Sequence, residues 1–362
     1  MHRDSDSIVV AIPAKDEAER IGACLLALAD QTRCPHAVVL FANNCSDATP
    51  AIASGMAPAL PYRLQVECHD FPMRHANAGQ ARRLAMALSE RRVRPDGILL
   101  TTDADAVAMP DWIERNCKAL STGADVVCGR VVLHPSEAAL IPAHLHADDA
   151  LECRLIALLD RLAVRLDPDP ADPLPRHTEA AGASLAVTRA AFRRVGGIPA
   201  LPSGEDRAFV RALARMDARI RHDPSVVVSV SGRTIGRAPG GMADTIRRRM
   251  QQQDEFADEQ VEPAVDAYRR YDFRSRARRA WRRQSMPPEL AIDLGISPHR
   301  LDRMLAERYF GNAWACIEAA SPFLTRRRVR FSELPRQIDH ARHLLEHVRD
   351  PDLVCGPGSK AP

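Results

Sequence analysis

Several features are scarce in this chain, and each scarcity excludes a class of protein. No apolar run approaches the roughly 18 residues that a transmembrane helix needs, so the sequence predicts no membrane span. None of the nine cysteines belongs to a C-x-x-C pair, which argues against a structural zinc site. Their scatter through apolar segments predicts reduced thiols in a cytoplasmic protein, and the polar N-terminus indicates no signal peptide.

Lysine and aromatic residues are scarce as well. Lysine contributes only three of the 50 basic residues, which in a chain this rich in alanine indicates a coding bias more than selection for guanidinium chemistry. Aromatic residues make up 4% of the chain, and its basic stretch neither interleaves them nor contains a recognisable nucleic-acid-binding module. Because the net charge is only +3, we expect no nucleic-acid partner.

The most informative stretch is a short apolar run at 98–102 that ends in two carboxylates, Asp103 and Asp105. A turn at 95–97 precedes the run, which predicts a buried strand. Ligands of open α/β sheets bind outside the carboxyl ends of strands, and paired carboxylates there suit Mg²⁺ or Mn²⁺. The alternative is that Asp103 caps a turn and Asp105 begins a helix, and a lone D-x-D leaves both open.

Apolar runs alternate with helical patterns over the first two thirds of the chain. Alternation of this kind predicts an α/β fold with a mostly parallel sheet and helices on both faces. The strands are expected at 7–13, 37–41, 62–68, 98–102, 126–133, 182–187 and 225–230. A leucine-striped helix at 147–166 is predicted within an insertion at about 134–180.

The pattern changes after residue 240. We predict a first domain over 1–240, a helical C-terminal region over 241–350 and a disordered tail over 351–362. Residues 274–330 contain 13 arginines against five acidic residues. This excess indicates a solvated, self-paired helical surface or, alternatively, contact with an anionic partner.

Four stretches in order resemble the family 2 glycosyltransferases, which have the GT-A fold. They are 12–17, 43–49, 103–105 and 204–206, and the resemblance covers about 7–240. It implies a Rossmann-like GT-A domain that acts as a soluble, metal-dependent, inverting glycosyltransferase. Such an enzyme would move a single sugar from a nucleotide-diphosphate sugar to a hydroxyl acceptor. An anionic or lipid-linked acceptor would be compatible with the arginine-rich helices.

The resemblance also implies which residues hold the nucleoside. Pro13 and Ala14 would line the base, Glu17 would bond the base or ribose, and Asp47 would hold the base edge. Alternatively, Glu17 stabilises a helix's first turn and Asp47 is an N-cap. Asn43 stands in this site where many members have aspartate, so UDP, GDP and dTDP all stay open as the nucleotide.

The same resemblance assigns the charged groups. Asp105 would be the direct ligand of Mn²⁺ or Mg²⁺, with Asp103 shared between the metal and the ribose. Three arginines would approach the nucleoside or diphosphate. They are Arg82, preferred over Arg83, and Arg233 and Arg237 of a glycine-rich loop whose alternative role is an interdomain linker.

The predicted catalytic base is Asp206, with Glu205 binding the acceptor or orienting Asp206. The alternative for Asp206 is a capping box with Ser203. Two other functions compete with transfer: a non-catalytic sugar-nucleotide-binding or scaffolding protein, and a sugar-nucleotide pyrophosphorylase, which would need a glycine-rich loop after the first strand. The sequence identifies neither the acceptor nor the oligomeric state.

Overall fold

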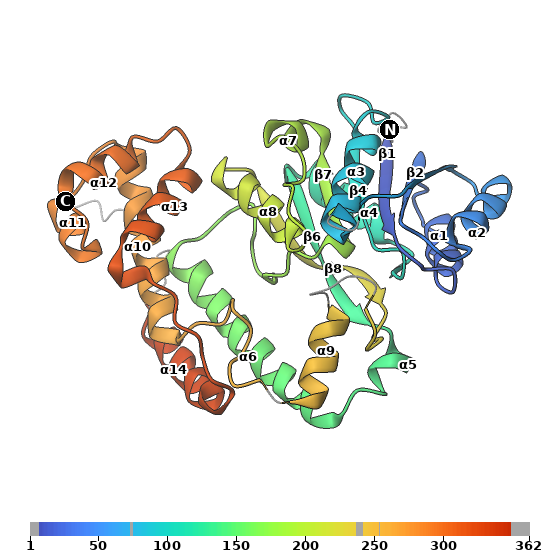
Figure 1. The fold of residues 1–362 in the computed structure, drawn as a ribbon. Helices are drawn as coiled ribbons and strands as arrows, with labels where there is room; N and C mark the ends of the chain where they lie inside the picture. The colour runs from blue at the N-terminus through green and yellow to red at the C-terminus, as the bar shows by residue number, and fades with distance from the viewer. Residues whose placement is uncertain (1–6, 73–74, 237–241, 253, 349–362) are drawn as a thin grey trace, which may run out of the picture. The chain divides into compact units, whose positions relative to one another are not determined.

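The computed structural model describes residues 7–72, 75–236, 242–252 and 254–348, which form two compact units (Figure 1). The first unit is built from described residues of 1–142, 175–214 and 218–252, and the second from those of 143–174, 215–217 and 253–362. The predicted nucleotide-site residue Arg237 and the predicted tail at 351–362 lie outside the described residues.

The first unit contains an eight-stranded sheet in the order β3-β2-β1-β4-β7-β6-β8-β5. The strands are β1 Ile8–Ala14, β2 Ala37–Asn43, β3 Arg63–His69, β4 Ile98–Thr101, β5 Val107–Ala108, β6 Val126–Leu133, β7 Leu185–Thr188 and β8 Ile220–Val230. Neighbours are parallel except where β7 meets β4 and β6 and where β5 meets β8. The predicted α/β fold with a mostly parallel sheet is confirmed.

Side chains of β1 alternate between two apolar clusters, one on each face of the sheet. Val10 and Ile12 pack with α1 (Ile21–Ala29) and α4 (Trp112–Ser121), whereas Val9 and Ala11 pack with α3 (Ala78–Glu90) and α8 (Glu205–Arg215). This period of two follows from the pleat of a strand and explains why helices cover both faces. The helices of this unit are α1 Ile21–Ala29, α2 Thr49–Met56, α3 Ala78–Glu90, α4 Trp112–Ser121, α5 Pro135–Ala138, α7 Arg189–Arg194, α8 Glu205–Arg215 and α9 Met242–Gln251.

The strands β1, β2 and β4 carry the predicted site to one edge of the sheet. In the parallel register, Ala14 lies opposite Ala42 of β2, and Ala11 lies opposite Thr101 of β4. The segments 15–20, 44–48 and 102–106 therefore all leave the sheet at its carboxyl edge. Three of the four stretches predicted from the sequence converge there.

The second unit is helical. Its helices are α6 Ala143–Leu166, α10 Ala264–Arg283, α11 Pro288–Leu294, α12 Pro298–Leu305, α13 Phe310–Ala320 and α14 Leu334–His347. The predicted leucine stripe of α6, including Leu155 and Leu162, is buried against Ala267 of α10 and Ile338 of α14. Asp167, just after α6, also pairs with Arg278. Segment 143–174 therefore packs with the C-terminal helices, although the sequence analysis assigns it to an insertion in the first domain.

Several arginines of 274–330 are paired within this unit. Arg274 and Arg278 contact Asp167, and Arg276 contacts Asp293. Across the part of the chain that the structure describes, no helix is both long and apolar enough to cross a membrane.

Candidate active site

Arg82 is the centre of one cluster of predicted residues. It lies in α3, whose N-cap is Asn77, and it is only 6% exposed. Its Nε donates to Glu205 Oε1 at 2.9 Å, and Nη2 donates to Asp103 Oδ1 at 2.6 Å. Its Nη1 donates to Thr101 Oγ1 at 2.8 Å and to the Gly182 carbonyl at 2.9 Å. The guanidinium is thus fixed among protein acceptors, and its contact with a nucleotide stays a prediction.

Asp206 is held by backbone amides at the start of α8. Its Oδ2 accepts from the Gly182 amide at 2.8 Å, and its Oδ1 accepts from the Arg207 amide at 2.7 Å. The predicted alternative, a capping-box bond to the Ser203 amide, is not formed. Glu205 is 4% exposed and forms an ion pair with Arg82. Asp206 is half-buried and has no ion pair with the described residues.

Arg233 is the centre of a second cluster. It follows β8 and makes a two-point contact with Glu17, with Nη1 to Oε2 at 2.8 Å and Nη2 to Oε1 at 2.5 Å. The same Nη2 lies 3.2 Å from Asp105 Oδ2. Because Asp103 and Asp105 are two residues apart, the Arg82 and Arg233 clusters meet at the end of β4.

Asp105 is the most strongly perturbed carboxyl group of these clusters. Burial and the nearby charge of Asp103 raise the pKa of Asp105 to about 7, while Arg233 acts in the opposite direction. The two clusters contain four carboxyl groups, Glu17, Asp103, Asp105 and Glu205, and only two arginines pair with them, Arg82 and Arg233. An arrangement of this kind favours an additional cation.

The two loops predicted to hold a nucleoside are bonded to each other. Asp16, in the left-handed region with φ of 53°, accepts from the Ser46 amide at 2.6 Å. Asp47 Oδ2 accepts from the Ala18 amide at 2.9 Å, and its Oδ1 accepts from the Thr49 amide at 2.9 Å. These bonds give Asp47 a structural role at the start of α2 without excluding a ligand contact.

The remaining nucleoside residues lie at the ends of β1 and β2. Pro13 is half-buried, and the side chain of Ala14 is 3% exposed. Asn43 is buried, and its Oδ1 has no hydrogen-bond partner among the described residues. A buried acceptor without a donor is a position that a ligand N–H or O–H group satisfies.

Comparison with known families shows what the first part of the chain resembles. Residues 9–172 match the family model for glycosyl transferase family 2. This part of the chain is similar to that family. The expected family 2 resemblance is therefore confirmed, and with it the assignment of the chain as a glycosyltransferase. No curated protein sequence matches the chain.

Solved structures similar to this glycosyltransferase are distant in sequence. Residues 1–349 of Staphylococcus aureus TarS in complex with UDP share 14% identity, covering 94% of this chain and 90% of that one, with a TM-score of 0.45. A Pyrobaculum calidifontis mannosyltransferase in complex with GDP-Man and Mn²⁺ shares 17% sequence identity. The match covers 96% of this chain and 77% of that one, with a TM-score of 0.45. A third structure is glucosyl-3-phosphoglycerate synthase from Mycobacterium tuberculosis in complex with Mn²⁺, UDP and phosphoglyceric acid. It shares 16% sequence identity, and the match covers 71% of this chain and 82% of that one, with a TM-score of 0.39.

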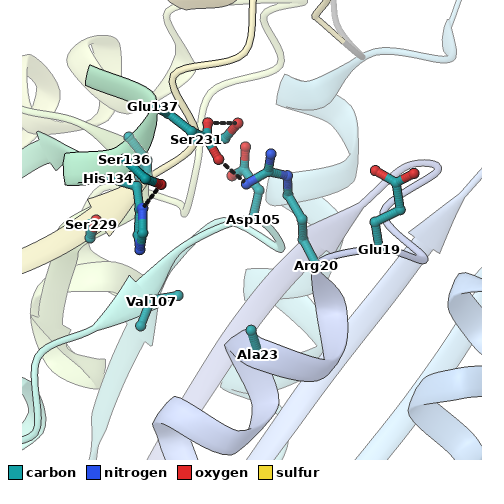
Figure 2. Close-up of a pocket in the computed structure, with 11 residues that line it drawn as sticks. Glu19, Arg20, Ala23, Asp105, Val107, His134, Ser136, Glu137, Ser229 and Ser231 are labelled. Atoms are coloured by element: carbon teal, nitrogen blue, oxygen red, sulfur yellow. Dashed lines mark hydrogen bonds and ion pairs between the residues drawn. The ribbon is translucent and has the colours of Figure 1, made fainter. Parts of the chain in front are cut away.

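The sequence analysis of this glycosyltransferase missed a pocket of about 290 Å³ beside Asp105. It lies between the start of α1 and the ends of β6 and β8 (Figure 2). Glu137 of α5 lines it and bonds Arg20, Ser231 and the backbone of Gly232. No motif signals Glu137, because its partners lie 94 to 117 residues away in the sequence.

Replacing Arg82 with methionine is expected to destabilise the glycosyltransferase by about 3–5 kcal/mol, because Glu205 would stay buried without its partner. Urea denaturation monitored by tryptophan fluorescence measures this as a lower midpoint. Arg83→Met is the matched control, since Arg83 is the neighbouring arginine and makes no ion pair with the described residues. Equal midpoints for the two variants would contradict the buried-pair interpretation.

Proposed function

We propose that this glycosyltransferase is metal-dependent and inverting, and that it moves one sugar from a nucleotide-diphosphate sugar to a hydroxyl acceptor. The observation that supports this most is the convergence of Asp103, Asp105 and Asp206 around the carboxyl end of β4. Arg82 bonds Asp103 directly, and Gly182 bonds both Arg82 and Asp206. Asp103 and Asp206 are thereby held by one network, and Asp105 follows two residues after Asp103.

Asp103 and Asp105 would hold the cation. Both offer the hard oxygen atoms that Mg²⁺ and Mn²⁺ prefer, and the burial of Asp105 beside Asp103 and Glu17 favours added positive charge. When bound, the cation acts as a Lewis acid that stabilises the negative charge of the departing nucleoside diphosphate. Arg233 lies close enough to Asp105 to contribute a second positive charge beside that leaving group.

Asp206 would accept the proton of the acceptor hydroxyl. The charge of the neighbouring Glu205 is neutralised by Arg82, which leaves Asp206 as the carboxylate of this pair without an ion-pair partner. Each Asp206 oxygen accepts one backbone N–H and keeps further lone-pair directions for a substrate proton. The backbone bonds orient the group, as a general base requires.

The interlocked loops after β1 and β2 would hold the nucleoside. Glu17, Asn43 and Asp47 remain our candidates for contacting the base or ribose, with Pro13 and Ala14 beside them. Among these, the unpartnered Oδ1 of Asn43 is the acceptor best prepared for a ligand donor. The donor nucleotide is proposed only as the UDP, GDP or dTDP class.

Release of nucleoside diphosphate tests this function without knowledge of the acceptor. The protein is incubated with UDP-, GDP- and dTDP-sugars and Mn²⁺, and the free diphosphate is quantified. We expect slow release from one donor class, lost with EDTA. If one sugar nucleotide binds but no nucleoside diphosphate is released, even when a panel of hydroxyl acceptors is added, a sugar-nucleotide-binding protein would be favoured instead.

Cation binding is expected to tighten as the pH rises. Below a pKa of about 7, Asp105 is mostly protonated, and a cation must displace that proton. The Mn²⁺ affinity should therefore increase by up to roughly tenfold per unit between pH 5.5 and 7, and level off above that. Calorimetric titration at several pH values measures this slope, and an affinity that falls with rising pH would contradict it.

A further inference from the structure

Glu137 joins three parts of the chain that come together beside Asp105. Its Oε1 accepts from Arg20 Nη1 at 2.8 Å. Its Oε2 accepts from the Gly232 amide at 2.6 Å and from Ser231 Oγ at 3.0 Å. Figure 2 shows the Arg20 guanidinium directed at Glu137, and a second dashed line joins the carboxylate to Ser231.

These bonds fix the residues immediately before Arg233. The strands β6 and β8 end together, with Leu133 opposite Val230, so α5 and the segment 231–233 leave the sheet side by side. A Cβ on Gly232 would lie 3.1 Å from the Cβ of Glu137, so glycine permits the close approach. The backbone that carries Arg233 is thus held against α5.

The residues before α1 are linked to the same segment directly through Glu17 and indirectly through Glu137. Glu17 bonds the Arg233 guanidinium, and Arg20, three residues later, bonds Glu137. Burial raises the pKa of Glu137, but the bonds from Arg20, Ser231 and Gly232 outweigh it, and the net shift is downward. The carboxylate is therefore charged at neutral pH and keeps all three contacts.

We propose that Glu137 is a positioning residue for the transfer reaction: it holds segment 231–233 so that Arg233 serves as the countercharge of Glu17 and Asp105. The inference rests on the proposed cation site at Asp103 and Asp105. A divalent cation and Arg233 are attracted to the same Asp105 carboxylate, so the two compete for it in the absence of donor. Glu137 sets the strength of that competition by fixing where Arg233 lies.

The test uses Mn²⁺ alone, so the nucleotide need not be known. Free Mn²⁺ is followed by electron paramagnetic resonance in titrations of the full-length wild type, Arg233→Gln, Glu137→Ala and their double variant. Removing the competing charge in Arg233→Gln should tighten Mn²⁺ binding roughly tenfold. Glu137→Ala should tighten it roughly threefold, the effect of about one lost hydrogen bond, and should add nothing in the Arg233→Gln background.

The sign of the Glu137→Ala effect separates positioning from simple electrostatics. Loss of a negative charge near a cation site by itself weakens Mn²⁺ binding, whereas release of Arg233 tightens it. Glu19→Ala is the matched control, because Glu19 lines the same pocket and makes no hydrogen bond or ion pair with the described residues (Figure 2). Its Mn²⁺ affinity should stay within about twofold of wild type.

Two outcomes overturn different claims. Unchanged or weaker Mn²⁺ binding by Glu137→Ala, beside tighter binding by Arg233→Gln, would overturn the positioning role. Glu137→Asp keeps the charge on a shorter side chain and serves if the alanine variant does not fold; it should also tighten Mn²⁺ binding, whereas unchanged or weaker binding would count against the role. If Asp105→Ala binds Mn²⁺ as well as wild type, the proposed cation site itself fails.

Discussion

Replacing Asp206 with asparagine is expected to lower glycosyl transfer about 100-fold to 10,000-fold while donor affinity stays within about threefold of wild type. The asparagine amide cannot take up the acceptor proton. Its side-chain oxygen can still accept from the Gly182 amide, while its NH2 group cannot accept from the Arg207 amide, so we expect the fold to be retained with one hydrogen bond fewer. Turnover with a donor and acceptor pair identified by screening, together with calorimetry of the nucleoside diphosphate, measures the two quantities separately.

The matched control for this experiment is Asp96→Asn. Asp96 lies before β4 at the opposite end of the strand from Asp105, and its side chain is 65% exposed. This variant should transfer sugar at the wild-type rate. Near wild-type transfer by Asp206→Asn would show that another group is the base.

Replacing Asp105 with alanine is expected to remove metal-dependent nucleotide binding. Substituting a residue that only hydrogen-bonds to a metal ligand typically lowers the metal affinity about 10-fold to 100-fold. Loss of the proposed direct ligand should therefore lower the affinity at least about 100-fold. Calorimetry of the nucleoside diphosphate with Mn²⁺ and with EDTA measures the effect. Nucleotide binding in EDTA should be equal in the variant and the wild type.

The fold of Asp105→Ala should remain intact. Asp105 is buried with a raised pKa, so its ionised form is unfavourable in the folded protein without metal, and Glu17 still pairs with Arg233 in the variant. We therefore expect an unliganded melting temperature no lower than that of wild type. A folded variant that still binds nucleotide only with Mn²⁺ would place the cation elsewhere.

The architecture of the first unit was predictable because local patterns determine it. The run at 98–102 is apolar and bounded by turn residues, and it forms the buried strand β4 at the centre of the sheet. Alternation of strands with helical patterns required parallel neighbours, as found for β1 with β2 and β4. The carboxyl ends of these strands then had to meet at one edge, where Asp103 and Asp105 lie.

The partners of the site residues were not predictable. Arg82 was expected to approach a ligand, yet it is buried between Glu205 and Asp103, which lie 123 and 21 residues away in the sequence. Glu137 carries no motif, and its role depends on β6 and β8 ending together. Such contacts arise from tertiary packing, which single-sequence periodicity does not encode.

The packing of α6 is a similar case. Its leucine stripe indicates a buried helix face but does not say which element covers it. The structure covers the stripe with α10 and α14, more than 90 residues later in the chain. The sequence therefore predicts the helix correctly, whereas the predicted insertion in the first domain differs from the unit in which the helix packs.

The most direct test of a metal-dependent donor site is a thermal-shift panel of UDP, GDP, dTDP and CDP, each with Mn²⁺ and with EDTA. We predict that one nucleoside diphosphate raises the melting temperature of the wild type in Mn²⁺ and not in EDTA, and does not raise that of Asp105→Ala. That result would also select the donor class for sugar screening. If no nucleotide shifts the melting temperature under either condition, the proposed donor and cation site is contradicted.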